Sequence, residues 1–210
     1  MSELRAYHNS RELKDHYIAR VSAHRAADEL IQGTGWKGGK GCAVGCVLDA
    51  YDHARYPIEL GIPEVLAHLE DRIFEGLAPS DAMPWPEAFL GAIRPGADLS
   101  LVWPRFAVWL LTVELSKWRA PTIDAVVALY ERRIAGDEPT VAEWKAAAAA
   151  ASAAADAAYD AAAYAAAYAA ASTAATAATA ATYATAAAAD TRHTSYKRQS
   201  RVLLRLLKEA

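Results

Sequence analysis

The chain has 210 residues, of which 22% are charged, and its formal net charge is −3. This length suits one domain or a domain with an appendage, and the balance of charge excludes the broad basic field with which proteins attract nucleic acid. Two cysteines are too few for a secreted disulfide framework, and residues 1–10 lack the apolar core of a secretory signal. We therefore expect free thiols and a cytoplasmic location.

The first 140 residues show helical spacing of apolar side chains and no alternating stretch of five or more residues that would predict a strand. A glycine-rich turn over residues 33–41 separates the first two helices. Ser10 can cap the first helix, and Pro63 suits the first turn of the third. The helices are predicted over residues 10–32, 42–53 and 62–77, and from Trp85, Trp103 and Pro121, the last ending at Gly136. The fold class is therefore all-α.

Alanine, the strongest helix former, occupies most positions from Ala146 to Asp190. A continuous helix of about 45 residues would extend roughly 68 Å, which exceeds a compact domain of this size. We expect either a protruding rod or two antiparallel helices packed closely together. Polar residues interrupt the segment every few positions, so we expect no membrane span.

The carboxyl-terminal segment, Tyr196 to Glu209, is predicted to be a basic amphipathic helix that packs its leucines on the core. The expected division is a helical globular domain over residues 1–140 and an alanine-rich segment over residues 141–210. The long alanine-rich helices can pack on the globular part, protrude from it, or pair between chains as a homo-oligomer.

The glycine-rich turn is the strongest local indication of a binding site. Its backbone N–H groups precede a predicted helix and its two lysines add positive charge, a combination typical of anion sites, and its tryptophan could stack on a ring. It is not a P-loop, because the lysine and the Ser/Thr of that motif are missing; the alternative is a flexible connector. The candidate ligand-binding residues are Trp36, Lys37, Gly38, Gly39, Lys40, Gly41 and Cys42.

Cys42 is also a candidate nucleophile, since a helix N-terminus lowers the pKa of a thiol. A base would have to come from the histidines at positions 8, 16, 24, 53 and 68. Cysteine hydrolases of this kind usually carry their catalytic histidine on a strand, and no strand is predicted here. The weak catalytic candidates are thus Cys42, His53 and His68, with no complete catalytic set.

We expect neither a metal nor another cofactor. The cysteines, Asp49 and His53 share a predicted helix face, but eleven residues of helix span roughly 16 Å, too far for one ion. The carboxylates of Glu70 and Asp71, near Glu64 and His68, are expected on a solvated helix face.

The segment from Trp36 to Cys46 (WKGGKGCAVGC), the segment from Leu60 to Gly76, and the alanine-rich tail resemble a family of bacterial and bacteriophage proteins that carries no assigned activity. A looser similarity, in composition, is to alanine-rich helical immunity proteins of bacterial toxin systems. A phage setting implies a host-directed role, such as blocking a defence protein or sequestering a nucleotide messenger.

Three functional hypotheses follow. The first is a non-enzymatic binding protein that captures a nucleotide-like anion or a host protein. The second is a cysteine-dependent hydrolase or transferase that uses Cys42. The third is a structural or interaction protein that acts through its alanine-rich helices.

Overall fold

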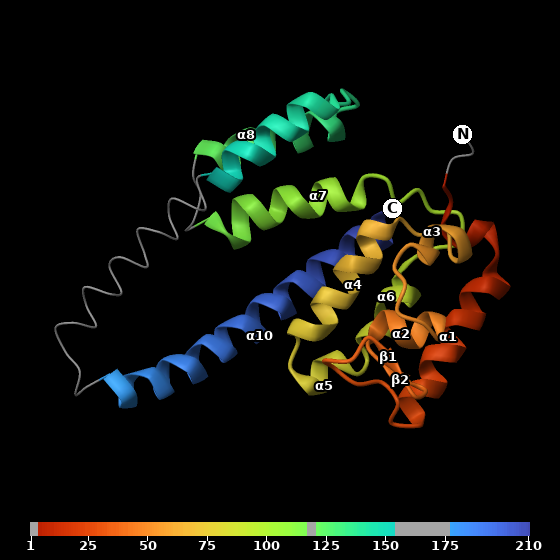
Figure 1. The fold of residues 1–210 in the computed structure, drawn as a ribbon. Helices are drawn as coiled ribbons and strands as arrows, with labels where there is room; N and C mark the ends of the chain where they lie inside the picture. The colour runs from red at the N-terminus through yellow and green to blue at the C-terminus, as the bar shows by residue number, and fades with distance from the viewer. Residues whose placement is uncertain (1–3, 117–120, 154–176) are drawn as a thin grey trace. The chain divides into compact units, whose positions relative to one another are not determined.

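The computed structural model describes residues 4–116, 121–153 and 177–210, whose regular elements are helices and one short two-stranded hairpin (Figure 1). The predicted all-α class is confirmed. In these ranges no helix is both long enough and apolar enough to cross a bilayer. The elements are η1 (Ala6–Asn9), α1 (Arg11–Ala26), β1 (Trp36–Lys37), β2 (Lys40–Gly41), α2 (Ala43–Leu48), α3 (Arg55–Glu59), α4 (Glu64–Gly76), α5 (Pro79–Ala82), α6 (Trp85–Ala92), α7 (Val102–Trp109), η2 (Leu110–Glu114), α8 (Pro121–Ile134) and α10 (Ala177–Glu209).

The chain divides into two compact units, residues 1–106 with 192–210, and residues 107–191. The boundary expected from composition, after residue 140, falls inside the second unit. The last helix is longer than predicted, because α10 begins at Ala177 rather than near Tyr196. The central part of the alanine-rich segment, where a rod or a helical hairpin was expected, lies outside the described residues.

The first unit is built on four helices, α1, α2, α4 and α6, which pack against one another. The end of α10 contributes to the same core, where Leu203, Leu206 and Leu207 are buried. Each fully buried leucine contributes about 2 kcal/mol. The basic side chains of this stretch stay exposed, as predicted: Lys197, Arg198, Arg201, Arg205 and Lys208.

The segment between α1 and α2 is closely packed and contains a short hairpin. α1 ends at Ala26 rather than at Gln32, because Asp28 adopts a left-handed conformation (φ 55°) and Leu30 then pairs with Gly41 as a β-bridge. Trp36–Lys37 and Lys40–Gly41 pair as a hairpin, with both residues of its turn, Gly38 and Gly39, at positive φ. Two such residues are typical of the tight turns that match the twist of a hairpin.

α2 is shorter than predicted, and this positions His53. The predicted helix ran to His53, but Asp49, at φ 54°, ends α2 after Leu48. Residues 49–54 form a loop that brings Tyr51 and His53 to α4. The helix predicted over residues 62–77 is confirmed as α4, with Pro63 as its N-cap.

In the second unit, α8 ends at Ile134, shortly before Gly136, which has positive φ as expected of a helix terminator. Arg132 then donates hydrogen bonds to Asp137 and Glu143. Residues 141–153 are helical.

Candidate functional site

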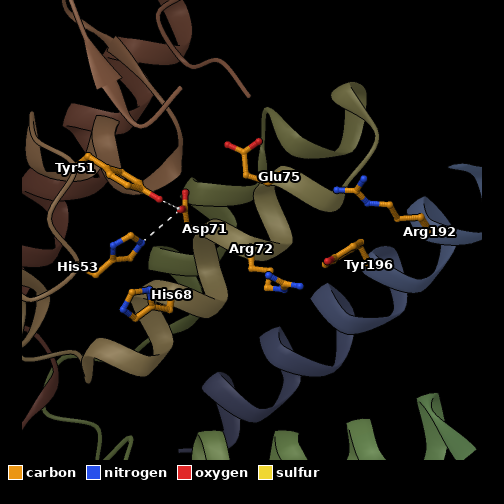
Figure 2. Close-up of a pocket in the computed structure, with 8 residues that line it drawn as sticks. All are labelled: Tyr51, His53, His68, Asp71, Arg72, Glu75, Arg192 and Tyr196. Carbon is orange, nitrogen blue, oxygen red and sulfur yellow. Dashed lines mark hydrogen bonds and ion pairs between the residues drawn. The ribbon is translucent and has the colours of Figure 1, made fainter. Parts of the chain in front are cut away.

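Asp71, on α4, lies at the centre of a cluster of polar side chains (Figure 2). A solvated carboxylate was expected at this position. The residue is only 8% exposed, so the prediction of a solvated face is wrong for Asp71. The hydroxyl of Tyr51 donates to its Oδ2 at 3.0 Å, and Nε2 of His53 lies 3.4 Å from the same oxygen. The other oxygen, Oδ1, is buried without a hydrogen-bond partner among the described residues.

Glu70, the neighbour of Asp71, also departs from the predicted solvated face, because it is fully buried. The hydroxyl of Tyr56 donates to Glu70 Oε2 at 2.6 Å. Burial raises the pKa of Glu70 well above its usual value, and the charge of Asp71 raises it further, against the opposing effect of the Tyr56 hydrogen bond. The carboxyl group is therefore neutral over a range of pH in which an exposed glutamate is charged.

His53 is enclosed by other rings. It stacks on His68 with ring centres 4.0 Å apart and meets Tyr51 edge-on at 4.9 Å. Burial, followed by the charge of His68, lowers the pKa of His53 and outweighs the attraction of Asp71. His53 is consequently a neutral imidazole at neutral pH.

Cys42 reaches the cluster from the start of α2, where it is 1% exposed. Burial raises the pKa of the thiol, and the neighbouring carboxylate of Asp71 raises it further. An activated nucleophile needs the opposite shift, towards a thiolate at neutral pH. Cys42 is thus a buried neutral thiol beside a carboxylate.

Glu75, one helical turn after Asp71, closes the cluster on the side of the glycine-rich loop. Its Oε2 accepts a hydrogen bond from the Gly33 amide at 2.8 Å. Burial raises the pKa of this carboxyl group. One ligand atom each from Cys42, Asp71 and Glu75 lies within 4.8 Å of the others.

Two adjoining hollows open on this cluster. The larger, about 570 Å³, is lined by Tyr51, His53, His68, Asp71, Arg72, Glu75, Arg192 and Tyr196. The smaller, about 420 Å³, is lined by Gly33, Thr34, Gly35, Trp36, Cys42, Tyr51, Asp71 and Glu75. Because the two hollows share Tyr51, Asp71 and Glu75, they form one depression along α4, which we call the α4 hollow.

The sequence-predicted binding residues are divided by the hairpin. Trp36 and Cys42 line the α4 hollow, whereas the two lysines and the two glycines between them, residues 37–40, are exposed and line neither of its parts. Lys40 instead reaches the carbonyl of Asp28 at 3.4 Å. Gly41 is buried against Trp36, where a Cβ would come within 2.8 Å of the indole ring.

Of the weak catalytic candidates, His53 and His68 stack on each other. Cys42 and His53 each interact with Asp71, which lies between them. The structure adds Tyr51, Arg72, Glu75, Arg192 and Tyr196. The burial of Glu70 had a signal in the sequence, because it lies four residues from both Leu66 and Phe74 and thus on the apolar stripe. No sequence signal pointed to Arg192 and Tyr196, because they lie far from α4 along the chain.

Comparison of the chain with family models, curated proteins and solved structures gave no match.

Proposed function

We propose that this protein binds a small nucleotide-like anion in the α4 hollow and does so without catalysing a reaction. One observation carries the proposal: two guanidinium groups and two carboxylates line the same hollow beside an exposed tyrosine. Such a lining offers cations for phosphate, acceptors for the amino groups of a base and an aromatic face for its ring.

The cationic part of the hollow consists of Arg72 and Arg192. Figure 2 shows Arg72 on α4, with Arg192 and Tyr196 on α10, across from Tyr51 and His53. Arg192 lies 5.8 Å above the Tyr196 ring, and among the described residues Arg72 has no ion-pair partner. Guanidinium groups bind phosphate through paired hydrogen bonds.

The acceptor and aromatic part lies towards the glycine-rich loop. Tyr51 is 54% exposed although its ring packs on Gly35, where a Cβ would come within 2.6 Å of it. A large exposed ring held against backbone offers a rigid surface for stacking. Asp71 and Glu75, next to it, are acceptors when ionised.

Binding is favoured over cysteine chemistry by the state of Cys42. The thiol is buried and its pKa is raised, and the nearby His53 is directed at Asp71 rather than placed to accept the proton of the thiol. A hydrolase would need a thiolate and a base within hydrogen-bond reach of each other.

The experiment is a thermal-shift screen with mono-, di- and cyclic nucleotides in the presence of a chelator, followed by calorimetric titration of any hit. The double variant Arg72→Ala with Arg192→Ala should lose at least about tenfold in affinity, because charge-assisted hydrogen bonds are removed. Lys37→Ala with Lys40→Ala is the matched control, since it removes two cations from the hairpin and should leave affinity unchanged.

Two outcomes contradict the proposal. If the lysine pair abolishes binding and the arginine pair does not, the ligand sits on the hairpin. If no nucleotide shifts the melting temperature, the ligand class is wrong.

A further inference from the structure

Cys42, Asp71 and Glu75 bring together a thiol and two carboxyl groups, the side chains with which proteins hold zinc and related ions. We propose that these three residues form a binding site for one divalent transition-metal ion, with zinc as the fitting class. On binding, the Cys42 thiol would release its proton to solvent. The resulting thiolate and the two carboxylates are compatible with zinc, which binds sulfur at about 2.3 Å and oxygen at about 2.0 to 2.2 Å. This proposal goes beyond ligand capture, because it requires no organic molecule.

The distances support a shared ion. One ligand atom of each residue lies within 4.8 Å of the others, while the ligands of a tetrahedral zinc ion are separated by about 3.3 to 3.8 Å. A closure of roughly 1 Å is therefore needed. Glu75 can supply it, because its side chain is only half-buried and long enough to rotate.

The independent observation is an unpartnered oxygen within the cluster. Asp71 is more than nine-tenths buried, and its Oδ1 has no hydrogen-bond partner among the described residues. A buried polar atom without a partner costs about 1 to 3 kcal/mol, and such atoms call for an ion or a water molecule. An ion held between Asp71 and its two neighbours satisfies this oxygen.

The surrounding hydrogen bonds orient both carboxylates for this role. Tyr51 holds Oδ2 of Asp71, and the Gly33 amide holds Oε2 of Glu75. Each carboxylate thus has one oxygen held by a hydrogen bond and a second oxygen that can bind an ion. Anchoring of ligands by outer hydrogen bonds is general in metal sites.

Three protein ligands leave a fourth position of a tetrahedral ion for solvent or a bound ligand. The three residues line the smaller part of the α4 hollow, so that position is reached from the hollow. His53, whose Nε2 is 3.4 Å from Asp71 Oδ2, lies beside the site and outside the set of three.

The test is titration of chelator-stripped, full-length protein with cobalt(II), followed by competition with zinc. The wild-type protein should bind one ion per chain, with a near-ultraviolet thiolate-to-cobalt charge-transfer band and intense visible bands. Cys42→Ser should abolish the charge-transfer band, and Glu75→Gln should lower affinity by at least about 100-fold. Tyr51→Phe, which removes only the anchor of Asp71, should lower affinity about tenfold.

Cys46→Ser is the matched control, because Cys46 is equally buried and donates instead to the Gly41 carbonyl. It should keep the charge-transfer band. The double arginine variant should also bind cobalt normally, so failure of the nucleotide proposal and failure of the metal proposal can be distinguished.

The proposal is overturned if the wild-type protein shows no cobalt band, or if Cys42→Ser and Glu75→Gln both bind cobalt as the wild type does. It is also overturned if Cys46→Ser, and not Cys42→Ser, removes the band. Should Cys42→Ser fail to fold, Glu75→Gln carries the same test, since a glutamine oxygen can still accept from the Gly33 amide.

Discussion

Replacement of Glu70 by glutamine should change how the free energy of unfolding depends on pH. The carboxyl group is fully buried with one hydrogen bond from Tyr56, and its folded pKa lies well above the unfolded value of 4.5. The folded state therefore keeps a proton that the unfolded state has released. Stability from this group is fully present below pH 4.5 and is lost as pH rises towards the folded pKa.

The size of this effect follows from linkage. Above the unfolded pKa, the wild-type protein should lose about 1.4 kcal/mol of this contribution per pH unit, until the pH reaches the folded pKa. Glu70→Gln cannot ionise and loses none of it. The buried amide adds a cost that does not vary with pH, so the slope of the difference is the informative quantity.

The assay is urea unfolding of wild type and variant at several pH values from 5 upwards. Glu64→Gln is the matched control, because the Glu64 side chain is 51% exposed and its replacement should leave the slope unchanged. Parallel pH profiles for wild type and Glu70→Gln would show that the buried carboxyl group ionises at its ordinary pKa, and the reasoning from burial would then be refuted.

Two further predictions concern packing and reactivity. Gly76→Ala should lower the free energy of unfolding, measured with urea, by about 1 to 3 kcal/mol, because a Cβ at Gly76 would overlap the Tyr196 ring. Gly91→Ala is the control, because Gly91 lies in α6 with nothing within 4 Å of its Cβ position. It should be neutral or slightly stabilising in the same assay. If both variants unfold alike, Tyr196 does not pack there. Cys42 should react with iodoacetamide far more slowly than a model thiol in native protein at neutral pH and at a normal rate in guanidinium, because it is buried and its pKa is raised. Fast native labelling would restore the cysteine hydrolase hypothesis.

Periodicity was enough to predict the all-α class and most helices of the first unit. Apolar spacing predicts which face of a helix is buried, and proline and glycine mark its ends. The leucines of the last helix were placed correctly for the same reason. The predicted ends of α1 and α2 were wrong, because Asp28 and Asp49 adopt left-handed conformations there. Such single-residue turns are stabilised by tertiary pairing, which no window of sequence contains.

The amino-acid sequence by itself determined most helices of the first unit and the lack of long strands in the part of the chain that the structure describes, because these depend on near neighbours along the chain. Tertiary structure alone decided the chemistry of the site. It turned Lys37 and Lys40 away from the hollow, buried Asp71 beside Cys42, and brought Arg192 to α4 from the far end of the chain. Burial and charge at a site depend on residues far apart in sequence, and only the folded chain brings them within interaction distance.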